Sequence, residues 1–88
     1  MTFRFAGVFM RFVDYQKEVQ FGGETLRQSL QMLVADYPDV KPVLLDNNGS
    51  LRGAVGLYLN EEMIHSKDLD APVGGSDVVE VFTAIAGG

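Results

Sequence analysis

The sequence contains no cysteine and no tryptophan among its 88 residues. Without cysteine the chain forms no disulfide, offers no thiolate to a metal ion and has no cysteine nucleophile. No apolar run approaches the ~20 residues that a membrane-spanning helix needs. The first apolar stretches, which contain Arg4 and Arg11, are also too short for the core of a signal peptide. These absences predict a cytoplasmic protein with no membrane partner.

Positive charge is also scarce. The chain has 7 Lys and Arg against 12 Asp and Glu, a net charge of −5, and the cations are not clustered in the sequence. A nucleic-acid-binding domain presents a basic patch or stripe, so we expect no nucleic-acid partner. The acidic balance favours either a basic protein partner or simply good solubility.

Few residues are suited to catalysis or metal binding. His65 is the only histidine, and no orienting partner accompanies it in the sequence. Two pairs of acids, Glu61 with Glu62 and Asp68 with Asp70, lie in predicted turns, where exposure to solvent explains them. No internal glycine pair precedes a phosphate-binding helix pattern. We therefore predict no metal site and no cofactor bound by this chain.

The patterning of apolar residues predicts one α+β domain over residues 1–88, because 47% of the residues are hydrophobic. Alternation predicts strands near residues 2–9, 17–21, 54–60, 63–64 and 78–85, with a loop at 10–16 between the first two. Apolar positions at helical spacing follow Thr25 and end at Pro38, which predicts the one main helix. Thr25 and Gln28 form a capping-box pattern. The connector 38–53 contains two prolines and a glycine turn, with a short helical turn or strand at 43–45.

A single helix with one apolar stripe must cover one face of a mixed sheet. The order strand, strand, helix, strand, short strand, strand predicts a β-grasp, or ubiquitin-like, fold with about five strands. The last strand is expected to pair with the first at the centre of the sheet, so that the C-terminal residues leave the domain directly from its core.

Two aromatic residues are expected on the face of the sheet that points away from the helix. If the alternating aliphatic residues of the strands at 54–60 and 78–85 face the helix, Tyr58 and Phe82 face away from it. Exposed aromatics that lie close together are typical of a protein interface. Cross-strand packing that covers the outer sheet is the alternative interpretation.

The chain ends in Gly87 and Gly88, which leaves two interpretations open. A glycine end is either a frayed terminus or a functional tail, since glycine enters narrow channels and adopts backbone angles closed to other residues. The stretches "AVGLYLNEEMI", "LDAPVGGSDVVEV" and "AIAGG" together resemble the ThiS/MoaD sulfur-carrier family, and the resemblance covers the whole chain in its order of elements. Two departures from the family are Ser76 before Asp77, where glycine is usual, and Thr83-Ala84, where prolines are common.

The resemblance implies a function for the end of the chain. The Gly88 carboxylate would be adenylated with ATP by a separate MoeB/ThiF-like enzyme, and sulfur would then displace AMP to give a thiocarboxylate. Ala86 and Gly87 would form the slim, flexible tail before it. The chain would be a co-substrate rather than an enzyme. Its second partner would be a sulfur-accepting enzyme or the large subunit of a molybdopterin synthase.

Two other functions remain open from the sequence. A ubiquitin-like modifier would use the same activated terminus to form isopeptide bonds with lysines, and a β-grasp interaction module would not use Gly88 at all. The pathway served is also open among molybdopterin, cysteine and other sulfur-containing metabolites. The length of the helix and of the 38–53 connector favours the MoaD-like or cysteine-pathway branch.

Overall fold

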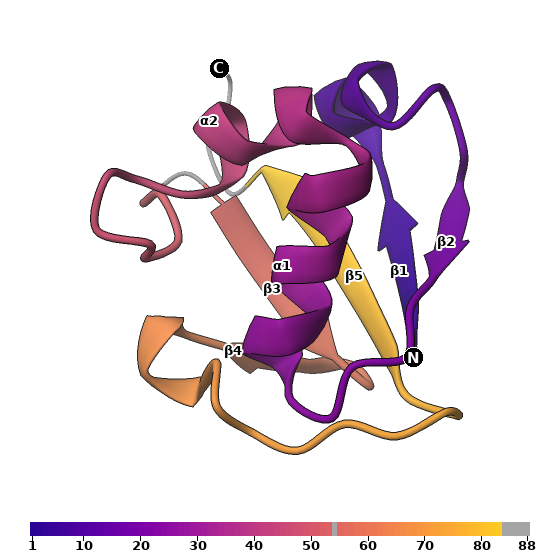
Figure 1. Cartoon of the computed structure of the whole chain (residues 1–88), viewed down its shortest axis with the longest axis vertical. Coiled ribbons are helices and arrows are strands. Elements are labelled where there is room, and N and C mark those ends of the chain that lie inside the picture. The colour runs from indigo at the N-terminus through magenta and orange to yellow at the C-terminus, as the bar shows by residue number, and fades with distance from the viewer. Residues whose placement is uncertain (54, 84–88) are drawn as a thin grey trace.

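The computed structural model describes residues 1–53 and 55–83 and shows one mixed sheet with a helix packed across one of its faces (Figure 1). The sheet has five strands in the order β2-β1-β5-β3-β4. Their bounds are Thr2–Phe5 (β1), Glu18–Gln20 (β2), Val55–Leu59 (β3), Glu62–Ile64 (β4) and Val78–Thr83 (β5). Strands β1 and β5 are parallel and the other neighbours are antiparallel. The predicted β-grasp fold, with the last strand beside the first at the sheet centre, is confirmed.

The main helix, α1, spans Leu26–Asp36 and begins as its sequence predicts. The Thr25 hydroxyl accepts a hydrogen bond from the backbone N–H of Gln28 at 3.2 Å. The Gln28 side chain accepts one from the backbone N–H of Glu24 at 2.9 Å, one residue before the cap itself. The helix ends at the residue before Tyr37, and Pro38 then begins a short 3-10 helix, η2 (Pro38–Val40).

The hydrophobic core lies between α1 and the sheet. Helix residues Leu26, Leu30 and Leu33 are buried against it, as the helical stripe predicts. The other buried apolar residues are Met1, Phe3, Phe5, Phe9, Val13, Val40, Leu44, Leu57, Leu69, Val79 and Val81. Because β1, β3 and β5 all contribute to this core, α1 packs against one face of the three central strands. Among residues 1–53 and 55–83, no α-helix packs across their other face (Figure 1).

The segment after β1 differs from the prediction of a longer strand followed by a loop. Strand β1 ends at Phe5, and Gly7–Phe12 form a 3-10 helix, η1. Gly7 has a φ of +63°, which glycine adopts at little cost and which breaks the alternation of a strand. The turn brings Phe9 into the core, where its side chain is 1% exposed. Burial of Phe9 therefore outweighs the local strand pattern.

The connector after α1 contains a short helical turn, one of the two alternatives predicted at 43–45, although it begins earlier, at Lys41. It contains η2, a single turn of helix α2 (Lys41–Leu44) and a turn around Gly49. A further 3-10 turn, η3, spans Ser66–Asp68 after β4. The predicted end of the last strand beyond Thr83 and the tail residues Ala86, Gly87 and Gly88 lie outside the described residues.

Candidate functional site

Strand alternation places one set of side chains of β3 and β5 on the outer face of the sheet. Tyr58 pairs with Glu80, and Gly56 pairs with Phe82, across the antiparallel β3–β5 ladder. The alternate residues Leu57, Val79 and Val81 are buried beneath α1. Tyr58 and Phe82 therefore face away from the helix, as the sequence predicts.

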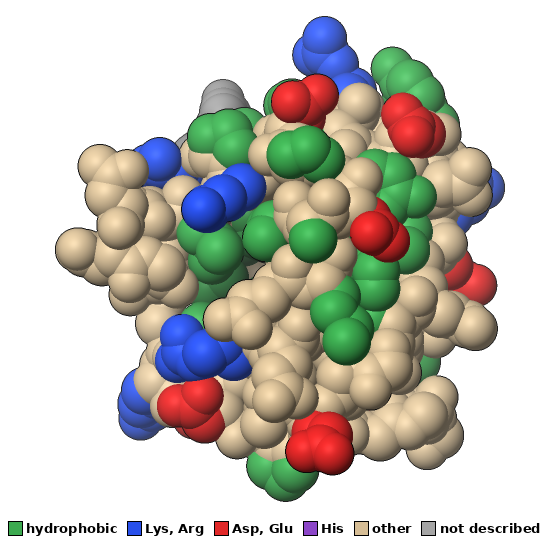
Figure 2. Space-filling view, in the orientation of Figure 1, with side chains coloured by type: hydrophobic (Ala, Val, Ile, Leu, Met, Phe, Trp, Pro, Cys, Tyr) green, Lys and Arg blue, Asp and Glu red, His purple; other side chains and the backbone are tan. Residues whose placement is uncertain are grey.

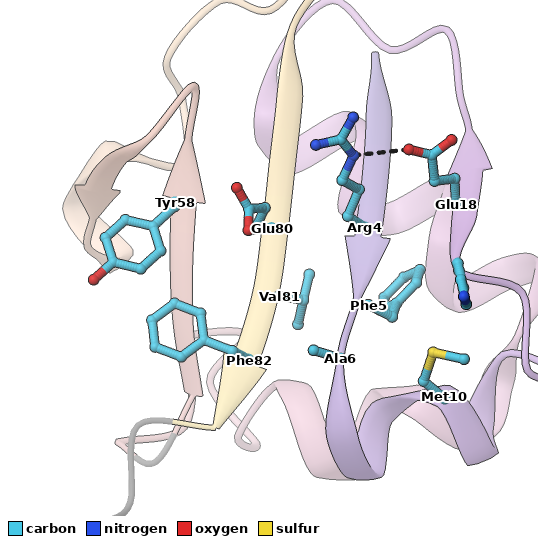
Figure 3. Close-up of a pocket in the computed structure, with 10 residues that line it drawn as sticks. Arg4, Phe5, Ala6, Met10, Glu18, Tyr58, Glu80, Val81 and Phe82 are labelled. Carbon is cyan, nitrogen blue, oxygen red and sulfur yellow. Dashed lines mark hydrogen bonds and ion pairs between the residues drawn. The ribbon is translucent and has the colours of Figure 1, made fainter.

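Tyr58 and Phe82 stack on each other (Figure 3). Their ring centroids are 4.8 Å apart and the ring planes differ by 12°. The Phe82 ring also covers Gly56, because a β-carbon added to Gly56 would collide with it. Both aromatic side chains are half-buried. Cross-strand packing thus joins the two rings into a single apolar surface at the end of β5.

Met63 extends this apolar surface. It lies opposite Tyr58 in the β3–β4 ladder, and its side chain is 50% exposed. We call the surface formed by Tyr58, Phe82 and Met63 the outer patch. The sequence predicts a short strand at Met63 but assigns its side chain to neither face of the sheet. Antiparallel pairing of this strand with the one before it, across the turn at Glu61 and Glu62, would have placed Met63 on the same face as Tyr58.

A groove with charged edges runs beside the outer patch (Figure 3). It has a volume of about 620 Å³, and its apolar lining includes Phe5, Met10 and Val81 as well as the two stacked rings. Along one edge, Arg4 Nε donates to Glu18 Oε2 at 2.7 Å. Glu80 lies between Arg4 and Tyr58 in the sheet register. An apolar centre bordered by charged residues is the usual anatomy of a protein interface.

A hydrogen-bonded clamp fixes the start of β5 to the end of β3. Asn60 Nδ2 donates to Asp77 Oδ1 at 2.9 Å, and Asn60 Oδ1 accepts from the Val78 N–H at 2.9 Å. The Gly74 N–H donates to Asp77 Oδ2 at 2.7 Å. These hydrogen bonds hold the pKa of Asp77 below its ordinary value, and the one from the Asn60 side chain has a larger effect than the one from the Gly74 N–H. Asn60 itself has a φ of +49°, which asparagine tolerates better than most residues.

The other polar residues considered from the sequence form no comparable site among the described residues. His65 is exposed and caps η3. Within residues 1–53 and 55–83, no group of three or more His, Asp or Glu side chains is placed to hold a metal ion. Nor does this part of the chain contain a helix long and apolar enough to cross a membrane. The outer patch and its groove, next to the end of β5, form the candidate site.

The comparison with known families adds a match over nearly the whole chain: the model of the ThiS family matches residues 4–88. The chain belongs to the ThiS family. The predicted resemblance is thereby confirmed at the level of the family. Members of this family are small carrier proteins rather than catalysts.

Solved structures of other proteins share the fold of this chain. The chain in the Amycolatopsis orientalis BexX/CysO complex is 23% identical, with a TM-score of 0.86, over 99% of this chain and 98% of that one. Mycobacterium tuberculosis CysO is 26% identical, with a TM-score of 0.83, over 96% and 98%. Small archaeal modifier protein 1 from Methanosarcina acetivorans is 20% identical, with a TM-score of 0.85, over 99% and 94%. No curated protein sequence gives a significant match.

Proposed function

We propose that this ThiS-family chain is a sulfur carrier whose Gly88 carboxylate becomes a thiocarboxylate. One observation carries the proposal: the family match runs through residue 88 and so includes the Gly-Gly end. The fold supports it, because β5 lies at the centre of the sheet and is the strand that leads into this segment. Gly88 is five positions after Thr83, so the carboxylate lies within a covalent reach of roughly 17 Å from the end of β5.

The proposed chemistry takes place in two steps on a partner enzyme of the MoeB/ThiF type. The Gly88 carboxylate attacks the α-phosphorus of ATP, and pyrophosphate leaves. Hydrosulfide then attacks the carbonyl carbon, AMP leaves with the C–O bond electrons, and a proton is released. The product is the thiocarboxylate. This chain supplies the acyl group and binds no ATP of its own, so its part in catalysis is to present Gly88 in the correct place.

We assign presentation of the tail to the outer patch and the groove beside it. Phe82 is adjacent to Thr83, the last described residue of β5, so a partner that contacts the outer patch is close to the start of the tail. Clamping by Asn60 and Asp77 fixes the other end of the same strand. A partner would thus dock on a rigid surface, and the tail would begin at a fixed position relative to that partner.

The proposal also concerns which pathway receives the sulfur. We favour a cysteine-pathway or MoaD-like role, since structural neighbours include CysO proteins and a putative molybdopterin converting factor subunit from Pyrococcus furiosus with a TM-score of 0.70. A protein-modifier function is the second candidate. The likeness to small archaeal modifier protein 1 and to Trypanosoma brucei Urm1, with a TM-score of 0.73, favours it.

Intact-protein mass spectrometry tests the proposal. The chain is incubated with ATP, sulfide and a MoeB/ThiF-like enzyme. We expect a gain equal to the mass difference between sulfur and oxygen, and no gain when ATP is omitted. A variant with one alanine added after Gly88 shifts the carboxylate by roughly 3.5 Å and should not be converted, although its thermal stability should be unchanged. Equal conversion of the extended variant would contradict the assignment of Gly88. Covalent attachment to lysines of other proteins, in place of thiocarboxylate formation, would favour the modifier function.

A further inference from the structure

A second hollow lies on the opposite side of the molecule from the outer patch. It is formed between α1 and the 45–49 turn, on the face that Figure 2 shows. We call it the helical-face pocket. Its apolar lining consists of Leu30, Val34, Leu45 and Leu69. Arg27 and Lys41 also line it, and Figure 2 shows hydrophobic side chains gathered between Lys and Arg side chains on this face.

The wall of this pocket is preformed by the turn after α2. Asp46 Oδ1 accepts hydrogen bonds from the N–H groups of Asn48 at 2.8 Å and Ser50 at 3.0 Å. The backbone N–H of Asp46 also donates to the Ser50 carbonyl at 2.8 Å. Gly49 has a φ of +80°, which this tight turn requires. A ligand would therefore meet a concave surface that is already folded, which lowers the entropic cost of binding.

The size of the pocket limits what it can hold. Its volume is about 220 Å³. Small-molecule sites typically have volumes of about 300–1,000 Å³. The helical-face pocket is thus smaller than a typical small-molecule site, and its size suits one large apolar side chain presented by another protein.

The charges around the pocket indicate what flanks that side chain. Lys41 makes no ion pair within residues 1–53 and 55–83. Arg27 Nε donates to Asp70 Oδ1 at 2.8 Å, which leaves the terminal nitrogens of the guanidinium available as donors. Asp70 offsets the charge of Arg27, so Lys41 is the cation beside the apolar hollow that is complementary to a carboxylate, and the free N–H groups of Arg27 can donate further hydrogen bonds to one.

We propose that the helical-face pocket docks an acidic segment of a partner protein through one large apolar side chain. Carboxylates on either side of this anchor pair with Lys41 and Arg27. Because α1 and the sheet separate this pocket from the outer patch, the partner binds here while the outer patch remains accessible. The proposal does not depend on the thiocarboxylate chemistry of Gly88, and its test does not use that chemistry.

A capped peptide, Gly-Glu-Asp-Phe-Asp-Glu-Gly, serves as the probe. It is titrated into the ¹⁵N-labelled full chain and followed by amide chemical shifts. We expect the shifts to be confined to residues around the pocket, in α1, α2, the 45–49 turn and the backbone near Leu69. Two altered peptides test the two parts of the proposal: one has Ala in place of Phe, and the other has Asn and Gln in place of Asp and Glu. Each should bind about ten times more weakly than the original peptide. A higher salt concentration should also weaken the binding of the original, acidic peptide.

Matched variants of the chain make the test specific. Lys41→Gln should raise the dissociation constant about tenfold, the effect of losing one charge-assisted hydrogen bond, whereas Lys67→Gln outside the pocket should not. Val34→Phe should fill the hollow and block the probe, whereas Met32→Phe, at an exposed position of the same helix, should not.

Shifts elsewhere on the chain, or equal binding of the three peptides, would overturn the proposal. Pocket shifts that change on dilution of the chain alone would also overturn it, because a second copy would then be the occupant.

Discussion

The ring of Phe82 lies flat against that of Tyr58 and at the same time covers the backbone of Gly56. The outer patch thus depends on a residue with no side chain. Gly56 has no positive φ, so its backbone is one that any residue adopts in a strand. The three nearest atoms to a β-carbon at this position all belong to the Phe82 ring, which is therefore the main obstacle to a larger residue there.

Gly56→Ala should destabilise the chain by about 1–3 kcal/mol, the usual cost of overpacking, because the new methyl group must displace the Phe82 ring. In a Phe82→Ala background the same change should be neutral or stabilising, since alanine loses less conformational freedom than glycine on folding. Urea unfolding of the four proteins in this double-mutant cycle measures the coupling. Equal costs in both backgrounds would contradict the contact between Gly56 and Phe82.

Asp77→Asn should reduce the loss of stability at low pH. The hydrogen bonds from Asn60 and Gly74 lower the pKa of Asp77 below its ordinary value of 3.8. A depressed carboxyl pKa stabilises the fold at pH values above the unfolded-state pKa, and this contribution is lost as pH falls through the folded-state pKa. The stability curve of the variant should therefore fall less steeply below about pH 4.

Asp39→Asn is the control for this titration, because Asp39 is exposed and its side chain makes no hydrogen bond within the described residues. Some acid sensitivity should persist in Asp77→Asn, since Arg27 also lowers the pKa of Asp70 by hydrogen bonding and by charge. Thermal unfolding at pH values from 2 to 7 provides the comparison. Parallel curves for wild type and Asp77→Asn would show that the clamp does not depend on the charge of Asp77.

Ser29→Ala should stabilise the chain by about 1 kcal/mol. The Ser29 side chain is 0% exposed, and its hydroxyl finds no hydrogen-bond partner among the described residues. An unsatisfied buried hydroxyl costs about 1–3 kcal/mol, and alanine is the better helix former. Ser66→Ala is the matched control and should destabilise the chain, because the Ser66 hydroxyl accepts from the Leu51 N–H at 3.0 Å. A loss of stability in Ser29→Ala would reveal a partner for its hydroxyl.

Much of the fold was predictable because its signals are local. Alternation identified the strands, helical spacing identified α1, and Thr25 with Gln28 located its start. The same alternation placed Tyr58 and Phe82 on the outer face, whereas the stacking of their rings depends on the register of the β3–β5 ladder. Periodicity could not predict η1, because the burial of Phe9 depends on packing against distant parts of the chain.

The clamp between Asn60 and Asp77 shows a second limit. Both residues appeared in the quoted family-like stretches, but they are 17 positions apart, and only the β3–β5 pairing brings them together. The helical-face pocket is also non-local, since α1, α2 and the 45–49 turn each contribute part of its lining. Sequence patterns therefore predicted elements and faces, whereas contacts between distant turns required the structure.

Phe82→Ala should weaken binding to the MoeB/ThiF-like enzyme without unfolding the chain. Truncating a central aromatic at an interface costs about 2 kcal/mol or more, which is roughly a 30-fold rise in the dissociation constant. Met63→Ala, at the edge of the outer patch, should cost less because its side chain is more exposed. Met32→Ala is the control, since Met32 is exposed on α1, away from the outer face. Isothermal titration with the enzyme measures the affinities, and circular dichroism checks the fold. An unchanged affinity for Phe82→Ala would remove Phe82 from the interface with the enzyme.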